Sequence, residues 1–347
     1  MARLEEVCKI LDSRRVPITA KDRKAGPYPY YGANGIQDYV ADYIFDDELV
    51  LLAEDGGHFG STDKPIAYRV SGKCWVNNHA HVLKAKECID VDYLCYSLMF
   101  RDVSDIVNGA TRQKLTQADM RKIEIPLLPI EEQKSVVAKI SKVFELIAIR
   151  KEQLAKLDRL VKSRFIELFG DPIDNTMGLK MLPLGEACYL KAGITTSADA
   201  IHEHSADYPI PCYGGNGVRG YVEEATQCGS YPIIGRQGAL CGNVQLATGE
   251  FHATEHAVLV TPLIETNVIW LFHLLKLMDL YRFHTGAAQP GLAVKTLNTV
   301  DIPIADISDQ NKFAAFVEQT QKSKLAIQQS LDKLETLKKS LMQEYFG

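Results

Sequence analysis

Two short polar loops hold the side chains best suited to specific hydrogen bonding. Thr111-Arg112-Gln113-Lys114 follows a Gly-Ala pair, and Gln289 lies at the matching place in the second half of the chain. Arg and Gln can form paired hydrogen bonds with base edges, whereas Thr and Lys suit phosphates. These residues are candidate DNA contacts; the alternative is an ordinary polar surface loop.

Two glycine-rich stretches, 54–60 and 235–243, occupy equivalent places and are expected to be loops between strands. Glycine there lets the backbone approach a partner closely. A Tyr-Gly-x-Asn-Gly motif in each half adds further candidates. The expected DNA-contacting residues are Tyr31, Asn34, His58, Lys64, Thr111, Arg112, Gln113, Lys114, Asn216, Arg219, Arg236, Gln237, Asn243 and Gln289.

The sequence has no motif that predicts catalysis. A Walker A loop, a methyltransferase-like Asn/Asp-Pro-Pro-aromatic motif and a dinucleotide-binding Gly-x-Gly-x-x-Gly are all missing. A carboxylate cluster of the nuclease kind around Glu54, Asp63 and Lys64 stays an alternative, although the second half has no counterpart of it. We therefore expect no catalytic residue.

Histidine pairs raise the question of a metal site. None has a supporting spacing, and only His79 and His256 are equivalent between the halves, because Val258 matches His81 and Trp75 matches His252. We expect structural histidines near strand ends and no metal site. The pairs are His79 and His81, His202 and His204, and His252 and His256.

Composition limits the class of protein. The net charge of −5 counts against a nucleic-acid binder, unless acid-rich helices carry the negative balance and leave the loops basic. No apolar run approaches the roughly 20 residues that span a bilayer, and the N-terminus does not resemble a signal peptide. The eight cysteines are scattered, which favours free, mostly buried thiols. A cytoplasmic protein without a membrane segment is expected.

The chain repeats itself, with equivalent positions about 180 residues apart. The stretch from Tyr31 to Val40 matches the stretch from Tyr213 to Val222. Gly109-Ala110 with Ile125-Pro126 matches Gly286-Ala287 with Ile302-Pro303, and Phe169-Gly170 matches Phe346-Gly347. The order and near-constant spacing indicate a tandem duplication of one unit, with its globular part first and its helix second.

Each unit ends in a long amphipathic helix. Residues 131–168 contain neither Gly nor Pro, and an apolar residue recurs every seven positions from Ile140 to Leu168, which predicts a coiled-coil seam. A second helix is expected from about Ser308 to Tyr345, with Ile327, Leu331, Leu334, Leu337, Leu341 and Tyr345 as its apolar stripe. Lys324 and Lys338 interrupt its match to the first seam. We expect the two helices to pack against each other, antiparallel; a coil formed with another chain is the alternative.

The expected fold class is α/β: two similar α/β domains separated by two long antiparallel helices that form an intramolecular coiled coil with pseudo-twofold symmetry. Short apolar runs such as Leu49–Ala53, Ala67–Val70 and His256–Val260 predict strands. One helix is expected in each domain, at Val91–Phe100 and at Val268–Leu280. The boundaries are residues 1–128 for the first domain, 129–170 for its helix, 171–306 for the second domain and 307–347 for the last helix.

This arrangement resembles the specificity subunit of type I restriction–modification systems. The resemblance covers essentially the whole chain. It is carried by Tyr28–Gly35, by the run from Gly109 through Ile125-Pro126 to Gln133 at the start of a long helix, by Leu168–Pro172, and by the repeated ending.

The resemblance implies two target recognition domains, each reading one half of an asymmetric, bipartite site in double-stranded DNA, and a helix pair that sets the gap. It implies docking of two methyltransferase (modification) subunits and of motor–nuclease (restriction) subunits. S-adenosylmethionine, ATP and Mg²⁺ would belong to those partners, and no cofactor to this chain. The alternatives are a self-sufficient DNA enzyme and a purely structural coiled-coil adaptor.

Overall fold

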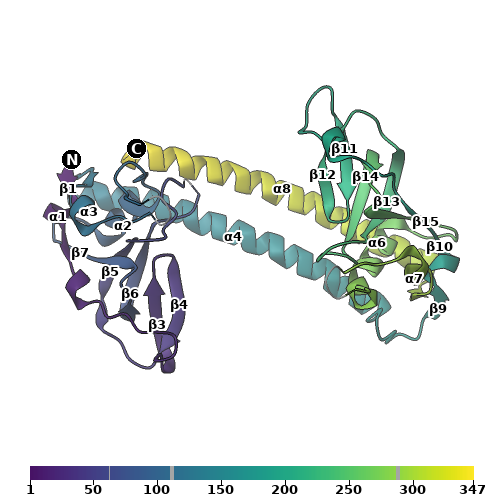
Figure 1. Ribbon diagram of the computed structural model, residues 1–347, viewed down its shortest axis with the longest axis horizontal. Coiled ribbons are helices and arrows are strands. Elements are labelled where there is room, and N and C mark those ends of the chain that lie inside the picture. Colours follow the sequence, from purple (N-terminus) through teal and green to yellow (C-terminus); the bar gives the residue numbers. More distant parts are fainter. Residues whose placement is uncertain (62, 110–112, 287–289) are drawn as a thin grey trace. The chain divides into compact units, whose positions relative to one another are not determined.

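The computed structural model describes residues 1–61, 63–109, 113–286 and 290–347. The chain divides into two compact units. Unit 1 comprises Met1–Lys151 and Gln329–Gly347, and unit 2 comprises Glu152–Gln328. Each unit therefore holds one sheet-bearing part together with portions of both long helices (Figure 1).

Unit 1 is built on a six-stranded sheet with the strand order β2-β7-β5-β6-β3-β4. Strands β3 and β6 run parallel, and the other neighbours are antiparallel. A second, two-stranded sheet joins β1 to β8. The strands are β1 (Ala2–Arg3), β2 (Cys8–Ile10), β3 (Ala25–Gly32), β4 (Gly35–Val40), β5 (Phe45–Ala53), β6 (Ala67–Val76), β7 (Ala80–Ala85) and β8 (Glu124–Ile125); the helices are α1 (Leu4–Val7), α2 (Val91–Met99), α3 (Gln117–Met120) and α4 (Ile130–Phe169).

Unit 2 repeats this plan element by element, with the strand order β10-β15-β13-β14-β11-β12 and a two-stranded sheet of β9 and β16. The same connectivity in both units confirms the duplication. The strands are β9 (Lys180–Pro183), β10 (Cys188–Ala192), β11 (Ile210–Gly214), β12 (Gly217–Val222), β13 (Gln227–Gly235), β14 (Val244–Ala253), β15 (Ala257–Pro262) and β16 (Asp301–Ile304); the helices are α5 (Leu184–Ala187), α6 (Val268–Leu277), α7 (Val294–Asn298) and α8 (Ile307–Phe346).

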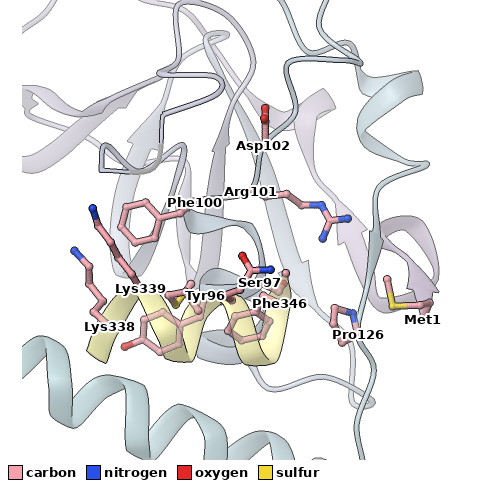
Figure 2. A pocket seen from close by; sticks show the side chains of 13 residues that line it. Met1, Tyr96, Ser97, Phe100, Arg101, Asp102, Pro126, Lys338, Lys339 and Phe346 are labelled. Atoms are coloured by element: carbon pink, nitrogen blue, oxygen red, sulfur yellow. The ribbon is translucent and has the colours of Figure 1, made fainter. Parts of the chain in front are cut away.

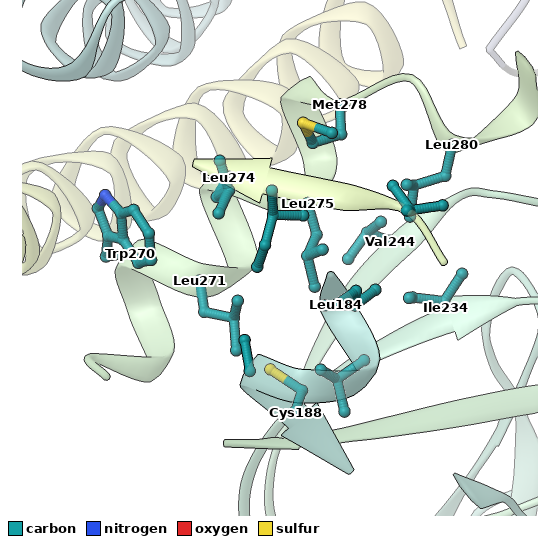
Figure 3. Close-up of a cluster of buried hydrophobic side chains, with 14 of the residues drawn as sticks. Leu184, Cys188, Ile234, Val244, Trp270, Leu271, Leu274, Leu275, Met278 and Leu280 are labelled. Atoms are coloured by element: carbon teal, nitrogen blue, oxygen red, sulfur yellow. The ribbon is translucent and has the colours of Figure 1, made fainter. Parts of the chain in front are cut away.

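The apolar runs become central strands. Residues Leu49–Ala53 of β5 are buried without alternation, because helix α2 covers one face of the strand and the smaller cluster around Phe45 and Val82 covers the other. In unit 2 the same role falls to β13, and helix α6 presents Trp270, Leu271, Leu274 and Leu275 to the core (Figure 3). The apolar cores thus lie between sheet and helix in each unit.

Both long helices form where the sequence predicts them, each with 40 residues. Helix α6 is shorter than expected. It ends at Leu277 because Asp279 adopts a left-handed conformation with φ 47°, and a 3₁₀ turn follows.

Within each unit the two long helices pack antiparallel (Figure 1). In unit 1, Lys139 Nζ lies 3.3 Å from Tyr345 Oη, whereas Lys151, further along α4, pairs with Glu335, further back along α8. In unit 2, Lys324 pairs with Asp158 at 2.7 Å, and Phe165 packs edge-on against Phe313. As the residue number rises along α4, the residue number of the contacting side chain in α8 falls, which shows that the two helices pack antiparallel.

The two lysines that interrupt the α8 seam are accommodated at its margin. Lys338 lies over the rings of Phe100 and Phe144 and pairs with Glu335. Lys324 reaches Asp158. One expected stripe residue, Leu337, is 44% exposed, so the stripe is narrower than the spacing of leucines indicates.

The expectation that the long helices are acid-rich is wrong. Helix α4 carries nine Lys and Arg against six Asp and Glu, and α8 carries six against five. The acidic excess of the chain therefore lies in the sheet-bearing parts. All eight cysteines are free and six of them are buried, as expected. Within the described residues no helix combines the length and apolarity needed to cross a membrane.

Candidate nucleic-acid interface

Three loops of unit 1 meet at one end of the sheet. The tip of the β3–β4 hairpin presents Asn34, whose Nδ2 donates a 2.9 Å hydrogen bond to the carbonyl of Gly56. The amide of Gly56 in turn donates to the carbonyl of Gln113 at 3.3 Å. The glycine-rich stretch after β5 therefore lies between the hairpin tip and the loop that holds Gln113 and Lys114, and Asn34, Gln113 and Lys114 belong to one surface.

A polar cluster supports this surface, with Asp12, Glu54 and His81 buried and Lys114 at its exposed edge. We call Asp12, Arg15, Glu54, His81 and Lys114 the Asp12 cluster. His81 is fully buried, with Nδ1 at 2.6 Å from Asp12 Oδ2 and Nε2 at 2.9 Å from the carbonyl of Leu115. Glu54 pairs with Arg15 and, at 3.0 Å, with Lys114. The cluster thereby joins Lys114 and Leu115 to β7 and to the end of β5.

The electrostatics of the cluster explain why its carboxylates can be buried. Burial by itself raises the pKa of Asp12, but hydrogen bonds from His81, the Val82 amide and Gln117 outweigh it, so the pKa lies below its usual value. For Glu54 the effect of burial is outweighed by hydrogen bonds from Arg15 and Lys114, and its pKa is also lowered.

The same cluster holds ligand atoms of Asp12, Glu54 and His81 within 4.8 Å of one another, which raises the question of a metal ion. The donor set does not fit one. The two carboxylates already face Arg15 and Lys114, and His81 uses Nε2 for the Leu115 carbonyl. A divalent cation would have to displace these positive groups, so the cluster is structural.

The corresponding loops of unit 2 enclose a cavity of about 570 Å³ between the β11–β12 hairpin tip and residues 237–240. Asn216, Arg219 and Gln237 line it, together with His256. Asn243 donates a 2.7 Å hydrogen bond from Nδ2 to Asn216 Oδ1 and so orients the Asn216 side chain. Three of the expected contact residues therefore share one concave surface, and a fourth supports it.

Glycine makes this close approach possible. A Cβ on Gly235 would lie 2.0 Å from the carbonyl oxygen of Gly215, so any side chain there would separate the hairpin tip from the loop. Gly217 at the start of β12 has φ 102°, a conformation that L-residues rarely adopt.

Arg236 occupies the position in unit 2 that Glu54 has in unit 1. Its amide donates to the His256 carbonyl at 3.0 Å, and its carbonyl accepts from Leu292 at 2.8 Å. Its Nε is buried and has no hydrogen-bond partner among the residues that the structure describes. The equivalent position thus holds a buried, paired carboxylate in unit 1 and a partly exposed arginine in unit 2.

The remaining candidates lie elsewhere or are not described. Tyr31 is half-buried and stacks on Tyr68 at 5.8 Å, inside a small apolar cluster. His58 and Lys64 have no described contact with Asn34 or Gln113; Lys64 follows Asp63, which pairs with Lys339 of α8. Thr111, Arg112 and Gln289 lie outside the described residues.

The structure adds residues that the sequence reasoning missed. Gln37 matches Arg219 in the repeat and accepts at Oε1 from Asn77 Nδ2 at 3.0 Å. His79 pairs with Asp55 at 2.7 Å, and His256 pairs with Glu255 at 3.2 Å. Comparing the halves position by position would have found Gln37, because Arg219 was already a candidate.

A family model described as the type I restriction modification DNA specificity domain matches residues 1–159 and 178–339. The two matches cover both sheet-bearing parts and most of both long helices. The chain belongs to this family. Membership in the type I specificity family accounts for the duplication, since the model matches once in each half.

Two curated members of the specificity family are similar over part of the chain. The specificity subunit of the type I restriction enzyme EcoprrI from Escherichia coli is 45% identical over 140 residues, which are 40% of this chain and 35% of that protein. A putative type I restriction enzyme specificity subunit from Haemophilus influenzae is 39% identical over 134 residues, which are 39% of this chain and 34% of that protein. The chain thus matches about a third of the length of these relatives.

The fold of the specificity family extends over the whole chain. The crystal structure of a type I restriction–modification S subunit from M. genitalium matches with a TM-score of 0.69 and covers 100% of this chain and 95% of that one. Their sequence identity is 15%, so the likeness shows the shared fold alone.

Proposed function

We propose that this chain is the DNA sequence-recognition subunit of a type I restriction–modification complex, and that each unit reads one half of a bipartite, asymmetric site. One observation carries the proposal: equivalent loops lie at the equivalent place on the sheet of each unit but carry different side chains. Gln37 corresponds to Arg219, and Glu54 corresponds to Arg236. A duplicated scaffold with divergent loops is suited to reading two unlike half-sites.

The long helices serve as a spacer in this proposal. Two similar units joined by an antiparallel helix pair would be related by a pseudo-twofold axis, which matches the symmetry of duplex DNA backbones. The length of helix between the units would then set the gap between half-sites. An insertion of a few residues in both helices should change that gap and leave the half-site sequences unaltered.

Catalysis would belong to partner subunits. We expect two methyltransferase subunits, with motor–nuclease subunits in the full complex, and these would bring S-adenosylmethionine, ATP and Mg²⁺. In support, the buried carboxylates of the Asp12 cluster are neutralised by neighbouring cations, which leaves them no role as a catalytic acid, base or metal ligand. A cytoplasmic location follows from such partners.

Because the net charge of the chain is −5, DNA phosphates must be attracted by positive side chains gathered at the recognition surfaces. Arg219 supplies positive charge at the unit 2 cavity, and Lys114 at the unit 1 surface is half exposed despite its contact with Glu54. We therefore expect binding by the isolated chain to be weak and strongly salt-dependent, and binding by the assembled complex to be tighter.

Domain exchange tests the proposal. Residues 1–128 would be replaced by the corresponding part of another family member, and the methylated DNA sequence would be determined in cells that carry the methyltransferase partner. Only one half of the target should change. A change in both halves, or in neither, would contradict modular reading by the two units.

A further inference from the structure

The outer hairpin of each six-stranded sheet carries a β-bulge at the same place. In unit 1, β4 is the edge strand and pairs with β3. Tyr31 of β3 pairs with Ile36, whereas the residue before Tyr31 pairs with Asp38. Gln37 is therefore an extra residue of β4 that has no partner of its own in β3.

Unit 2 repeats the bulge in its own edge strand, β12. Tyr213 of β11 pairs with Val218, whereas the residue before Tyr213 pairs with the residue after Arg219, so Arg219 is the extra residue. We call each aliphatic residue and the extra residue that follows it a bulge pair: Ile36 and Gln37 in unit 1, Val218 and Arg219 in unit 2. The first member is aliphatic in both units, and the second differs.

The bulge explains why both members of the unit 2 pair face one cavity. Successive side chains of a regular strand point to opposite faces of the sheet, and a bulge interrupts this alternation. Val218 and Arg219 accordingly both line the cavity of about 570 Å³ beside the hairpin tip. Val218 is 49% exposed, and so is Ile36 in unit 1. An aliphatic side chain is thus exposed to solvent beside a polar one at equivalent places in both units.

In unit 1 a buried side chain orients Gln37. Asn77 is 3% exposed and donates a 3.0 Å hydrogen bond from Nδ2 to Gln37 Oε1. The carboxamide of Gln37 lies over Gly32, where a Cβ would be 2.2 Å from Gln37 Nε2. Oε1 keeps a second lone pair, and Nε2 donates to no residue that the structure describes. Gln37 can therefore offer one acceptor and one donor to a partner.

In unit 2 the corresponding buried residue leaves the side chain of Arg219 unattached. Thr254 aligns with Asn77 and is 0% exposed, and its hydroxyl has no hydrogen-bond partner in the described part of the chain. Arg219 is exposed and forms no hydrogen bond or ion pair with any described residue. Glu255, whose carboxylate is influenced by the charge of Arg219, pairs with His256 at 3.2 Å instead. The guanidinium of Arg219 therefore keeps its donors for a partner.

These side chains match the edges of particular bases in the major groove. Arginine forms paired hydrogen bonds with O6 and N7 of guanine, whereas glutamine pairs with N6 and N7 of adenine. An aliphatic side chain fits the 5-methyl group of thymine. Because the two members of a bulge pair are adjacent, they are suited to contact two neighbouring base pairs.

We propose that the bulge pair sets the base preference of each unit. In unit 2, Arg219 binds a guanine, and Val218 contacts the methyl group of a thymine in a neighbouring base pair. In unit 1, Gln37 binds an adenine, and Ile36 contacts a thymine methyl group. This inference rests on the proposed DNA recognition and adds the residues and the bases that meet.

Another cavity in unit 1 does not compete for this role. It has a volume of about 680 Å³ and lies between α2 and the last turns of α8 (Figure 2). Its wall includes Phe100 and Phe346, and none of its lining residues belongs to the β3–β4 hairpin. Lys338, which also lines it, is already paired with Glu335. The bulge pair therefore stays the assigned base contact of unit 1.

Transfer of the unit 1 side chains into unit 2 tests the assignment. The double variant Arg219→Gln with Thr254→Asn would be expressed with the methyltransferase partner, and the methylated motif would be determined by sequencing. One half-site should keep its sequence, and the other should change from G·C to A·T at a single base pair. Arg164→Gln, which replaces an exposed arginine of α4 in the same unit, is the matched control and should leave the motif unaltered.

Modified bases test the same contacts with the unaltered chain. In DNA titrations of the assembled complex, 7-deazaguanine in place of the assigned guanine should weaken binding by about fivefold, because it removes one of two hydrogen bonds. Uracil in place of the neighbouring thymine should weaken binding by about fourfold, the effect of one buried methyl group. Val218→Ala should abolish the effect of uracil in one half-site only, and Ile36→Ala should abolish it in the other.

Three results would overturn the inference. The double variant could keep the guanine of its half-site, the half-site of unit 2 could lack a guanine beside a thymine, or 7-deazaguanine could have no effect, which would make Arg219 a phosphate contact. A double variant that methylates nothing leaves the decision to the modified bases, which need no variant. In all of these cases a bipartite motif that depends on the chain would still support the proposed function, so the two failures are distinguishable.

Discussion

The Nε2–H of His81 donates a 2.9 Å hydrogen bond to the carbonyl oxygen of Leu115, and the Leu115 amide donates to the carbonyl of Glu54 at 2.7 Å. Strand β7, the residue after β5 and Leu115 are thereby joined at one point. Unit 2 has Val258 in place of His81 and Ala192 in place of Asp12. The backbone hydrogen bonds between Thr285 and Gly291 have equivalents between Asn108 and Lys114 in unit 1, so the His81 contact is an addition found in unit 1.

Replacing His81 by Val should destabilise unit 1 by roughly 3–5 kcal/mol, because Asp12 would keep a buried charge without its main partner. The double variant Asp12→Ala with His81→Val reproduces the unit 2 pair. It should be less destabilised than the sum of the single variants by about 1–3 kcal/mol. Urea unfolding of the four proteins in the cycle measures both quantities; strictly additive losses would show that the two side chains are not coupled.

Arg219→Gln gives unit 2 the residue that unit 1 has at position 37. If Arg219 contacts DNA, binding should weaken by roughly 1–3 kcal/mol, and the slope of log affinity against log salt should fall by about one if the contact is to a phosphate. Gln37→Arg is the reciprocal control and should steepen the salt dependence. Titrations of the assembled complex with DNA at several salt concentrations measure both the affinity and the slope. If neither changes in Arg219→Gln, Arg219 does not belong to the interface.

Gln133, buried at the start of α4, should be essential for attaching that helix to α2. Its Oε1 accepts from the Asp90 amide at 2.8 Å, and its Nε2 donates to the carbonyls of Cys88 and Leu128 at 3.0 and 2.7 Å. Gln133→Leu leaves these backbone groups unpaired. It should lower the free energy of unfolding, measured with urea, by roughly 2–4 kcal/mol.

Two glutamines of α8 serve as comparisons for that variant. Gln310 repeats the arrangement in unit 2, where it accepts from the Asn267 amide and donates to the Ala305 carbonyl, both at 2.8 Å, so Gln310→Leu should also destabilise strongly. Gln329→Leu, at an exposed position, should change stability by less than about 0.5 kcal/mol. Equal effects of all three variants would contradict the assigned role of Gln133.

His273 should make unit 2 sensitive to mild acid. Burial, with Lys276 and Lys324 nearby, lowers the pKa of His273 from 6.5 to about 4. Between these values the unfolded chain binds a proton that the folded chain does not, so stability falls as the pH falls from 6.5 toward 4, by at most about 3 kcal/mol. His273→Leu should flatten this part of the pH profile of the unfolding midpoint, and an unaltered profile would show that His273 does not titrate in this way.

The long helices were predictable within one residue at each end, because uninterrupted heptads and the absence of Gly and Pro are local signals. The strand order was not, since β3 pairs with β6 only after the chain has passed through β4 and β5. The burial of Phe165 and Phe169 was also missed, because both side chains pack against Trp270 of α6 as well as against Phe313 of the partner helix α8.

The candidate site was predictable where it repeats. Asn34, Asn216 and Gln237 occupy matched loops that the duplication reveals. The Asp12 cluster could not be predicted, because its members lie far apart in sequence and occur in one unit only. The mismatch of His81 with Val258 shows that this histidine is not repeated, but it gave no hint that His81 contacts Asp12 and the Leu115 carbonyl.

Methylome sequencing of cells that carry this chain together with its methyltransferase partner tests the central claim most directly. The account predicts one methylated motif made of two unlike half-sites at a constant separation, lost when the chain is deleted. A methylation pattern that is the same with and without the chain, or a motif without a gap, would contradict it.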